Sequence, residues 1–295
     1  MKLRAATRSS ALARWQSEYI AALLRASDPA ITVELVLVET AGDRNRTAPL
    51  HELGGQGIFS AEVQEALLDG RADIAVHSAK DLPSRTADEL VLAAVPFRGD
   101  ARDALVGRPL DALESGATVA TGSVRRRAQL AALRPDLRFT DLRGNIQTRL
   151  TKVPDGGAIV MAFAALERLG LADLAAQIFE PYEMVPQVGQ GALAVECRKG
   201  DPSAAVVAAI EHAPSRMCVD AERAFLAELG SGCDLPVGAY ATLDGGGQLT
   251  VVGLVASIDG GRVVRSSAGG RDPSEVGARL AADVLSAGGR SLLDR

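Results

Sequence analysis

Lysine, aromatic residues and cysteine are all scarce in this chain of 295 residues. Aromatic residues make up 3% of the sequence, so few side chains are available for stacking on nucleic-acid bases. The net charge of −5 also excludes nucleic-acid binding through overall positive charge. No apolar run approaches the roughly 20 residues of a membrane helix, and the first residues lead into a strand-like segment instead of a signal peptide. We therefore expect a cytoplasmic protein that binds neither nucleic acid nor a membrane.

The chain also lacks the usual patterns of metal and nucleotide sites. Its three cysteines, Cys197, Cys218 and Cys233, form no C-x-x-C pair, and its three histidines are scattered. These numbers and spacings argue against a disulfide framework and against a zinc site, so we expect no metal. Neither a G-x-G-x-x-G nor a Walker sequence occurs, which leaves nucleotide cofactors without support.

Arginine, in contrast, is abundant. It accounts for 28 of the 32 basic residues. Residues 98–152 carry a net charge of +5, which leaves −10 for the rest of the chain. GC-rich codon usage is one explanation of the excess, with most of these side chains on the solvated surface. The concentration in one segment of an acidic protein instead favours a small anionic ligand over a polyanion.

Apolar runs alternate with helical patterns over the first 190 residues, which predicts two α/β units with largely parallel sheets. Residues 3–7 form the first predicted strand, and the following helix is capped by Ser9 or Ser10. Four residues at helical spacing predict the buried face of that helix: Leu12, Trp15, Tyr19 and Leu23. Residues 40–57 have no period, and they are either a lid over a site or an ordinary surface loop. The second unit begins near Arg98.

The pattern changes from Ser215 onward. A helix to Leu229, a glycine-containing turn and two or three strands precede a final helix. That last helix is predicted from its first turn, where Asp272 is the N-cap and Pro273 and Glu275 follow. This part is an α+β module distinct from the first two units.

Arginines recur where predicted strands lead into helices. Parallel sheets bind ligands beyond the carboxyl ends of their strands, where helix N-termini present N–H groups to anions. The residues at these junctions are Arg8, Arg125, Arg126 and Arg143, and Asn145 is the predicted cap of a helix that carries Arg149. For any one of them a surface position is the simpler interpretation. Together they predict a ligand with several carboxylates or phosphates, because arginine binds such groups with two parallel hydrogen bonds.

Two further positions have the chemistry of a reaction site. Lys80 and Asp81 end a predicted strand, where a carboxylate can move protons or stabilise a cation and a lysine can bind an anion. A helix cap or a surface ion pair is the alternative for this pair. Cys233 lies in the glycine turn G-S-G-C-D, which either exposes a nucleophilic thiol or contains a small buried residue.

Seven segments, in this order, closely resemble the porphobilinogen deaminase family, also called hydroxymethylbilane synthases. They are ATRSSALARWQ, GGQGIFSAEVQEALLDGRADIAVHSAKDLP, TGSVRRRAQL, DLRGNIQTRL, ALERLGL, VGQGALAVEC and GCDLPVGAY. The resemblance spans nearly the whole chain. It implies two α/β domains like type II periplasmic binding proteins and a small C-terminal α+β domain. The implied boundaries are 1–97 with 191–211 for the first domain, 98–190 for the second and 212–295 for the third.

The resemblance also implies an activity. The family is a transferase that deaminates porphobilinogen and condenses four molecules head to tail onto a covalent dipyrromethane primer. It releases the linear hydroxymethylbilane and ammonia in tetrapyrrole (haem) biosynthesis. We expect a monomer whose partner is the small molecule porphobilinogen. The alternative is a non-enzymatic small-anion-binding protein of the same fold, which would need neither Cys233 nor the third module.

By the same resemblance, Asp81 is the catalytic carboxylate and Cys233 carries the dipyrromethane through a thioether. Further cofactor contacts align with Lys80, Thr121, Ser123, Arg125, Arg126, Asn145 and Arg149. Contacts to the carboxylates of substrate and growing chain align with Arg8, Ser10, Gln16, Arg143 and Arg168. The predicted lid departs from the family, because Gln56 and Glu52 stand where lysines are common.

Overall fold

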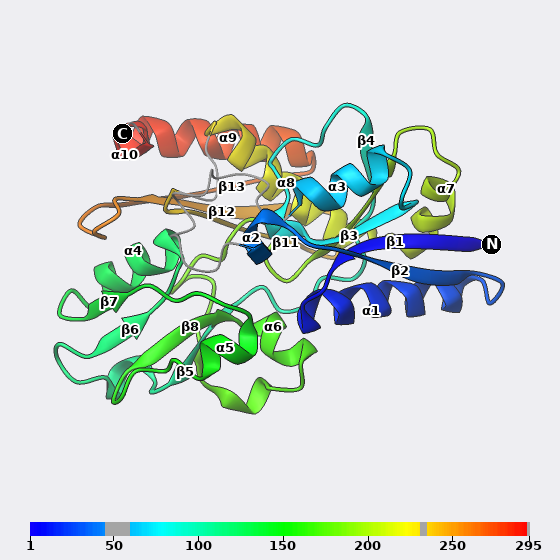
Figure 1. Ribbon diagram of the computed structural model, residues 1–295. Helices are drawn as coiled ribbons and strands as arrows, with labels where there is room; N and C mark the ends of the chain where they lie inside the picture. Colours follow the sequence, from blue (N-terminus) through cyan, green and yellow to red (C-terminus); the bar gives the residue numbers. More distant parts are fainter. Residues whose placement is uncertain (45–59, 231–234, 294–295) are drawn as a thin grey trace.

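The computed structural model describes residues 1–44, 60–230 and 235–293, which form three β-sheets with helices packed against them. Figure 1 shows the first sheet (blue and cyan) beside the second (green), with the C-terminal part (orange and red) packed over both. Within the described ranges, no helix has the length and hydropathy that crossing a membrane requires.

The first domain is built on a five-stranded sheet of order β2-β1-β3-β10-β4. Its strands are β1 (Lys2–Arg8), β2 (Thr32–Val38), β3 (Ile74–Ser78), β4 (Leu90–Ala94) and β10 (Leu193–Arg198). Its helices are α1 (Ala11–Ser27), α2 (Ala41–Arg44), α3 (Ala61–Leu68) and α7 (Ser203–Val207), with short 3-10 turns at η2 (Ala79–Asp81) and η5 (Ala208–Ile210). Helices α1 and α7 cover one face and α3 the other. Only β10 runs antiparallel to its neighbours.

Helix α1 confirms one sequence prediction and corrects another. Ser10 is the N-cap, and its hydroxyl accepts from the Ala13 N–H at 3.3 Å. The fully buried stripe is Gln16, Ile20 and Leu24, whereas the predicted face that contains Leu12 is only half-buried. Tyr19 and Leu23 of the predicted face pack against the core. The most buried stripe lies one residue further along, because Gln16, a polar residue, faces inward and donates to the Ser78 hydroxyl at 2.9 Å.

The second domain repeats the same sheet order as β7-β6-β8-β5-β9. Its strands are β5 (Asp103–Gly107), β6 (Thr118–Ala120), β7 (Arg138–Thr140), β8 (Ala158–Ala162) and β9 (Ala175–Ile178). Its helices are α4 (Val124–Leu133), α5 (Ile146–Leu150) and α6 (Phe163–Arg168), with 3-10 turns at Leu110–Ala112 and Ala172–Leu174. In each domain the single reversed strand, β10 or β5, is the first strand after the chain arrives from the other domain. The largely parallel sheets are therefore confirmed, and strand β9 was not predicted.

The third domain has an antiparallel sheet, β11-β12-β13, covered on one face by two helices. The strands are β11 (Val237–Leu243), β12 (Leu249–Ala256) and β13 (Val263–Gly270). The helices are α8 (Ala213–Glu228) and α9 (Pro273–Val284), the latter continuing through a π turn, η6 (Leu285–Gly289), into α10 (Arg290–Leu293). Asp272 caps α9 as predicted, because its carboxylate accepts from the Glu275 N–H at 2.9 Å. The other sheet face packs on α4 of the second domain.

The two segments that cross between the first and second domains lie side by side. The Gly99 N–H donates to the Gly191 carbonyl at 3.1 Å, and a Cβ on Gly191 would lie 2.5 Å from the Gly99 carbonyl oxygen. Glu222 of α8 binds both segments. Its buried carboxylate accepts from the Arg98 guanidinium at 2.6 Å and from the Gly189 N–H at 2.7 Å. The third domain thus binds both segments that connect the other two domains.

Candidate active site

A cavity of about 410 Å³ lies at the carboxyl ends of β1 and β3 and is lined by residues of the first domain alone. We call it the first-domain cavity. Its polar lining residues are Arg8, Ser10, Gln16, His77, Ser78 and Asp81. Four residues that the sequence analysis placed at a site therefore meet here: Arg8, Ser10, Gln16 and Asp81. The loop prediction over residues 40–57 lies mostly outside the described residues.

Asp81 ends η2, directly after β3, and is half-buried in the wall of this cavity. Its carboxylate has no hydrogen bond or ion pair with any residue in the described ranges. The Asp81 charge raises the pKa of Arg149, which indicates that the two side chains lie near each other. Burial of Arg149 is the larger effect, and it lowers that pKa to about 10. The second domain therefore faces Asp81 with a cation.

His77, next to Ser78 in this wall, is buried and forms a pair with a second buried acid. Its Nε2 lies 3.2 Å from a carboxylate oxygen of Glu196, and the Gln64 amide donates to the same oxygen at 2.8 Å. Burial alone would raise the pKa of Glu196, but the neighbouring His77, the hydrogen bond from Gln64 and the charge of Arg223 together hold that pKa below its usual value. The pair thus supports the cavity wall behind Asp81.

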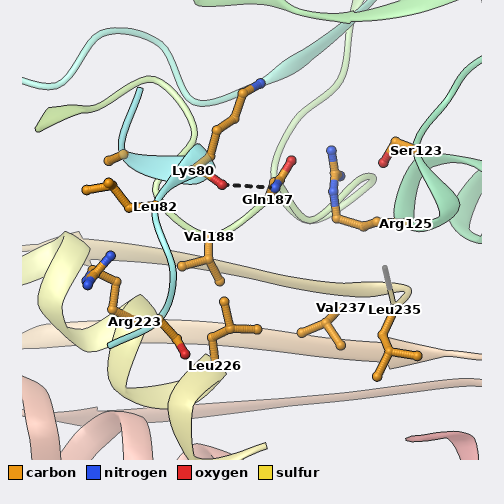
Figure 2. A pocket seen from close by; sticks show the side chains of 12 residues that line it. Lys80, Leu82, Ser123, Arg125, Gln187, Val188, Arg223, Leu226, Leu235 and Val237 are labelled. Carbon is orange, nitrogen blue, oxygen red and sulfur yellow. Dashed lines mark hydrogen bonds between the residues drawn. The ribbon is translucent and has the colours of Figure 1, made fainter. Parts of the chain in front are cut away.

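A second cavity, of about 460 Å³, is lined by residues of all three domains (Figure 2). We call it the interdomain cavity. Its apolar lining consists mainly of Leu82, Val188, Leu226, Leu235 and Val237, and its polar lining includes Lys80, Ser123, Arg125, Gln187 and Arg223. Lys80 and Asp81 are neighbours in the chain, yet they line different cavities. The η2 turn therefore borders both cavities.

Lys80 lies at the junction of the domains. Its ammonium donates to the Gln190 side-chain oxygen at 3.2 Å, and the Gln187 amide donates to the Lys80 carbonyl at 3.3 Å (Figure 2). Burial lowers the pKa of Lys80 to about 8, and the Arg126 guanidinium adds to the effect. The ammonium is thus an anion-binding group whose charge changes near neutral pH.

Arg125 and Arg126 lie in the first turn of α4, and both are held by one buried carboxylate, Asp103 at the start of β5. The two guanidiniums lie 2.7 and 2.8 Å from the Asp103 oxygens. Burial alone would raise the pKa of Asp103, but the two cations and Gln190 lower it to about 2. Both arginines were predicted to bind cofactor carboxylates. The structure places them on an internal acid, which holds their guanidiniums in fixed positions.

Four more of the predicted cofactor residues form hydrogen bonds at helix N-termini. Asn145 caps α5 as expected, with its side-chain oxygen 2.9 Å from the Thr148 N–H. Ser123 caps α4, and the Thr121 hydroxyl accepts from the Ser123 N–H at 3.2 Å. Arg149 donates to the Gly144 carbonyl at 2.8 Å. Of these, Ser123 lines the interdomain cavity.

The remaining predicted substrate residues belong to the second domain. Arg143 precedes α5, and its pKa is lowered by partial burial. Arg168 ends α6 and reaches across to the first domain, where its guanidinium lies over the Trp15 ring at 5.7 Å and donates to the Gly191 carbonyl at 2.6 Å. Neither lines the two cavities described above.

Cys233 lies outside the described residues. Cys197 and Cys218 are both buried, and burial raises the pKa of each thiol to about 11. Both are therefore thiols and not thiolates at neutral pH, which makes them poor nucleophiles. No group of three or more His, Cys, Asp or Glu side chains suited to a metal occurs in the described ranges.

Sequence reasoning missed three polar residues that organise the site: Asp103, Gln190 and Glu222. Asp103 follows Arg102 and Glu222 precedes Arg223, so in the sequence neither acid differs from an ordinary surface charge, although both are buried. Gln190 donates to Asp103 at 2.8 Å and accepts from Lys80. No spacing in the sequence predicts that these three residues meet. Their partners are distant in the chain, so only the fold identifies them.

Family models and curated relatives match nearly the whole chain. A family model described as "Porphobilinogen deaminase, dipyromethane cofactor binding domain" matches residues 3–206, and "Porphobilinogen deaminase, C-terminal domain" matches residues 216–286. The porphobilinogen deaminase of Roseiflexus castenholzii is 45% identical over 97% of both chains. That of Acidothermus cellulolyticus is 46% identical over 99% of this chain and 91% of its own. The methionine-binding protein MetQ is a weaker match, with a TM-score of 0.45, 13% identity, and 70% and 88% of the two chains covered. The chain belongs to the porphobilinogen deaminase family.

Proposed function

We propose that the two cavities divide the porphobilinogen deaminase reaction, the first-domain cavity receiving porphobilinogen and the interdomain cavity holding the dipyrromethane. The chain is a transferase of tetrapyrrole biosynthesis with the family's dipyrromethane-binding domain. Family membership does not favour the alternative of a non-enzymatic anion-binding protein. We further propose that it is a cytoplasmic monomer with domain boundaries at 1–97 with 191–211, 98–190 and 212–295, which agree with the strands that each sheet contains.

The interdomain cavity fits a dipyrromethane. Two pyrrole rings with acetate and propionate groups need apolar walls for the rings and cations for the carboxylates. Val188, Leu226 and Val237 provide the first, and Lys80 and Arg125 the second. The Nε–H of Arg125 is buried without an acceptor, and this orphaned donor suits a carboxylate. When bound, the group supplies the free pyrrole carbon to which porphobilinogen is joined.

Cys233 is the proposed attachment point, through a thioether. Leu235, two residues further along the chain, lines the interdomain cavity. The other two cysteines are buried elsewhere, Cys197 in the core of the first domain and Cys218 on α8 in the core of the third, and their thiols are protonated at neutral pH. These observations support Cys233 as the nucleophile.

Asp81 is the proposed catalytic carboxylate. Porphobilinogen develops positive charge as its amino group leaves as ammonia, and a carboxylate beside the ring stabilises that charge and binds the pyrrole N–H. The carboxylate is ready for this role because no described residue neutralises it by direct contact. Arg8, Ser10 and Gln16, in the same cavity, are the proposed partners of the substrate carboxylates.

The second domain supplies the cations for a growing chain. Arg143, Arg149 and Arg168 lie at or near its helix ends, and burial lowers the pKa of all three. We propose that Arg149 and Asn145 face the cofactor, whereas Arg143 and Arg168 bind carboxylates of substrate and elongating product. Thr121, Ser123 and Arg126 complete the proposed cofactor contacts.

The observation that carries this proposal is the position of Asp81, in the cavity wall without an internal partner. Asp81→Asn keeps the shape and removes the charge, so we expect turnover to fall at least about 100-fold, the usual effect of losing an acid or base. Intact mass should still show one dipyrromethane per chain, with Cys233→Ser as the reference that lacks the increment. Asp88→Asn, an exposed acid in the next loop, is the matched control.

Two results would contradict the proposal. Turnover near the wild-type value in loaded Asp81→Asn protein would remove Asp81 from the chemistry. An active wild-type protein without the mass increment, or an increment that survives Cys233→Ser, would remove the proposed covalent primer.

A further inference from the structure

Arg223 is a buried arginine of the third domain that has no acidic partner. It lies on α8 with 8% of its surface exposed, and its guanidinium donates to the Thr86 hydroxyl at 3.3 Å. No carboxylate within the described ranges lies within 4 Å of it. The comparable buried arginines differ, because Arg98 is paired with Glu222 at 2.6 Å, and Arg125 with Asp103 at 2.7 Å.

This unpaired guanidinium lines the interdomain cavity. Figure 2 shows Arg223 at one end of a floor formed by Val188, Leu226 and Val237, with Arg125 at the other end. Lys80 also lines this cavity, but its ammonium is directed away from the floor and donates to Gln190. Cations of the second and third domains therefore stand at the two ends of one apolar surface, an arrangement that suits a flat ligand with carboxylates on more than one side.

Burying an arginine without a counter-ion is unfavourable, since the charge loses its hydration and gains one neutral hydrogen bond. The same burial lowers the pKa of Arg223, while Asp220 and Glu196 act from beyond contact distance to raise it. A ligand carboxylate would restore the missing partner. An anion-binding residue is expected to have this cost before its ligand is present.

We propose that Arg223 is a carboxylate-binding residue that the third domain contributes to the interdomain cavity. Its ligand is a pyrrole-borne carboxylate of the dipyrromethane or of the chain extended from it, so the inference rests on the proposed function. The domain that carries the proposed attachment cysteine then also binds the attached group through an ion pair.

A purely structural role is the competing explanation, because Arg223 connects α8 to the loop that contains Thr86. Thr86→Val removes that contact and keeps the guanidinium, whereas Arg223→Gln removes the charge. Arg223→Lys keeps the charge without the two parallel donors. The three variants therefore separate an anion-binding role from a role in tying the loop.

The test is cofactor assembly in apo-protein made in a host that lacks porphobilinogen. After porphobilinogen is added, the gain of one dipyrromethane is followed by intact mass. We expect Arg223→Gln to load at least about tenfold more slowly than wild type, the effect of losing a charge-assisted hydrogen bond. Arg223→Lys should be intermediate, and Thr86→Val should load like wild type. Thermal unfolding of the apo-proteins should show Arg223→Gln to be no less stable than wild type.

Loading of Arg223→Gln at the wild-type rate would overturn the inference, and so would equally slow loading of Thr86→Val. If Arg223→Gln fails to fold, the Arg223→Lys and Thr86→Val rates still decide, because only an anion-binding role slows the first and spares the second. A wild-type protein that never gains the increment contradicts the proposed function itself, a result distinct from slow loading of one variant.

Discussion

The two α/β domains share one sheet order, yet the helices after their equivalent strands β1 and β6 carry different chemistry. Both helices begin at a serine cap, Ser10 for α1 and Ser123 for α4. Helix α1 begins with Ala11, Leu12 and Ala13, whereas α4 places Arg125 and Arg126 at its second and third positions. The first domain therefore presents helix N–H groups beside Asp81, and the second presents buried guanidiniums.

Cations at a helix N-terminus are unfavourable, because the helix dipole already places positive charge there. The second domain compensates with Asp103 at the start of its reversed strand β5. The equivalent strand of the first domain, β10, begins with Leu193. The comparison shows that the shared fold determines where a site forms. Within that site, one acidic residue at the start of a strand determines whether neighbouring arginines are paired inside the protein.

Asp103→Asn would break this difference, and we expect the largest effect from it. The substitution leaves two buried guanidiniums without their carboxylate, which costs about 3–5 kcal/mol for a broken buried ion pair. The free energy of unfolding, measured in urea on apo-protein, checks the expectation. In wild type, Asp103 should contribute fully to the free energy of unfolding above pH 3.8, its ordinary pKa. That contribution should be lost as the pH falls towards about 2, its pKa in the folded protein.

Asp136→Asn is the matched control, because Asp136 also pairs with an arginine, Arg134, at 2.7 Å but on the surface. Its unfolding curve should stay close to that of wild type. If Asp103→Asn unfolds at the same urea concentration as this control, the buried cluster has no structural role and its arginines are available to a ligand without Asp103.

Lys80 sharpens the comparison, since it belongs to the first domain but lies near the arginines of the second. Its pKa of about 8 means that about one molecule in ten keeps the charge at pH 9. Because the charged form binds carboxylates, cofactor assembly in apo-protein should slow about tenfold from pH 7 to pH 9. Lys80→Met should be slow at both pH values, and Lys199→Met, at an exposed lysine, should follow wild type. A pH profile shared by all three proteins would contradict this role.

Much of the architecture was predictable from the sequence, because local patterns specify it. The caps of α1, α5 and α9 and the strands that precede the cavities follow from residue types at fixed spacing. The family was identifiable from ordered motifs, and the comparisons confirm it. The assigned roles of the individual site residues remain predictions.

What the sequence did not predict are interactions between distant parts of the chain. Asp103 binds Arg125 and Arg126, which lie 22 and 23 positions further along the chain. Glu222 binds Arg98, 124 positions before it. The buried Gln16 of α1 donates a hydrogen bond to Ser78 at the end of β3. Such contacts result from the packing of distant segments, and the periodicity of residues within one segment does not predict them.

The smallest expected effect concerns Gln56, which lies in the segment predicted as a lid and outside the described residues. Gln56→Lys restores a cation common in the family and makes the first domain more like the arginine-rich second. An exposed ion pair with a ligand carboxylate contributes at most about 1 kcal/mol and is screened by salt. We therefore expect a slightly lower Michaelis constant at low salt and none of this gain at high salt. Gln56→Met, of similar length and without charge, should show no salt-dependent gain. A large loss of activity in Gln56→Lys at either salt concentration would contradict this expectation. It would show that Gln56 makes a specific contact that lysine cannot replace, and that the missing charge is not the important difference at this position.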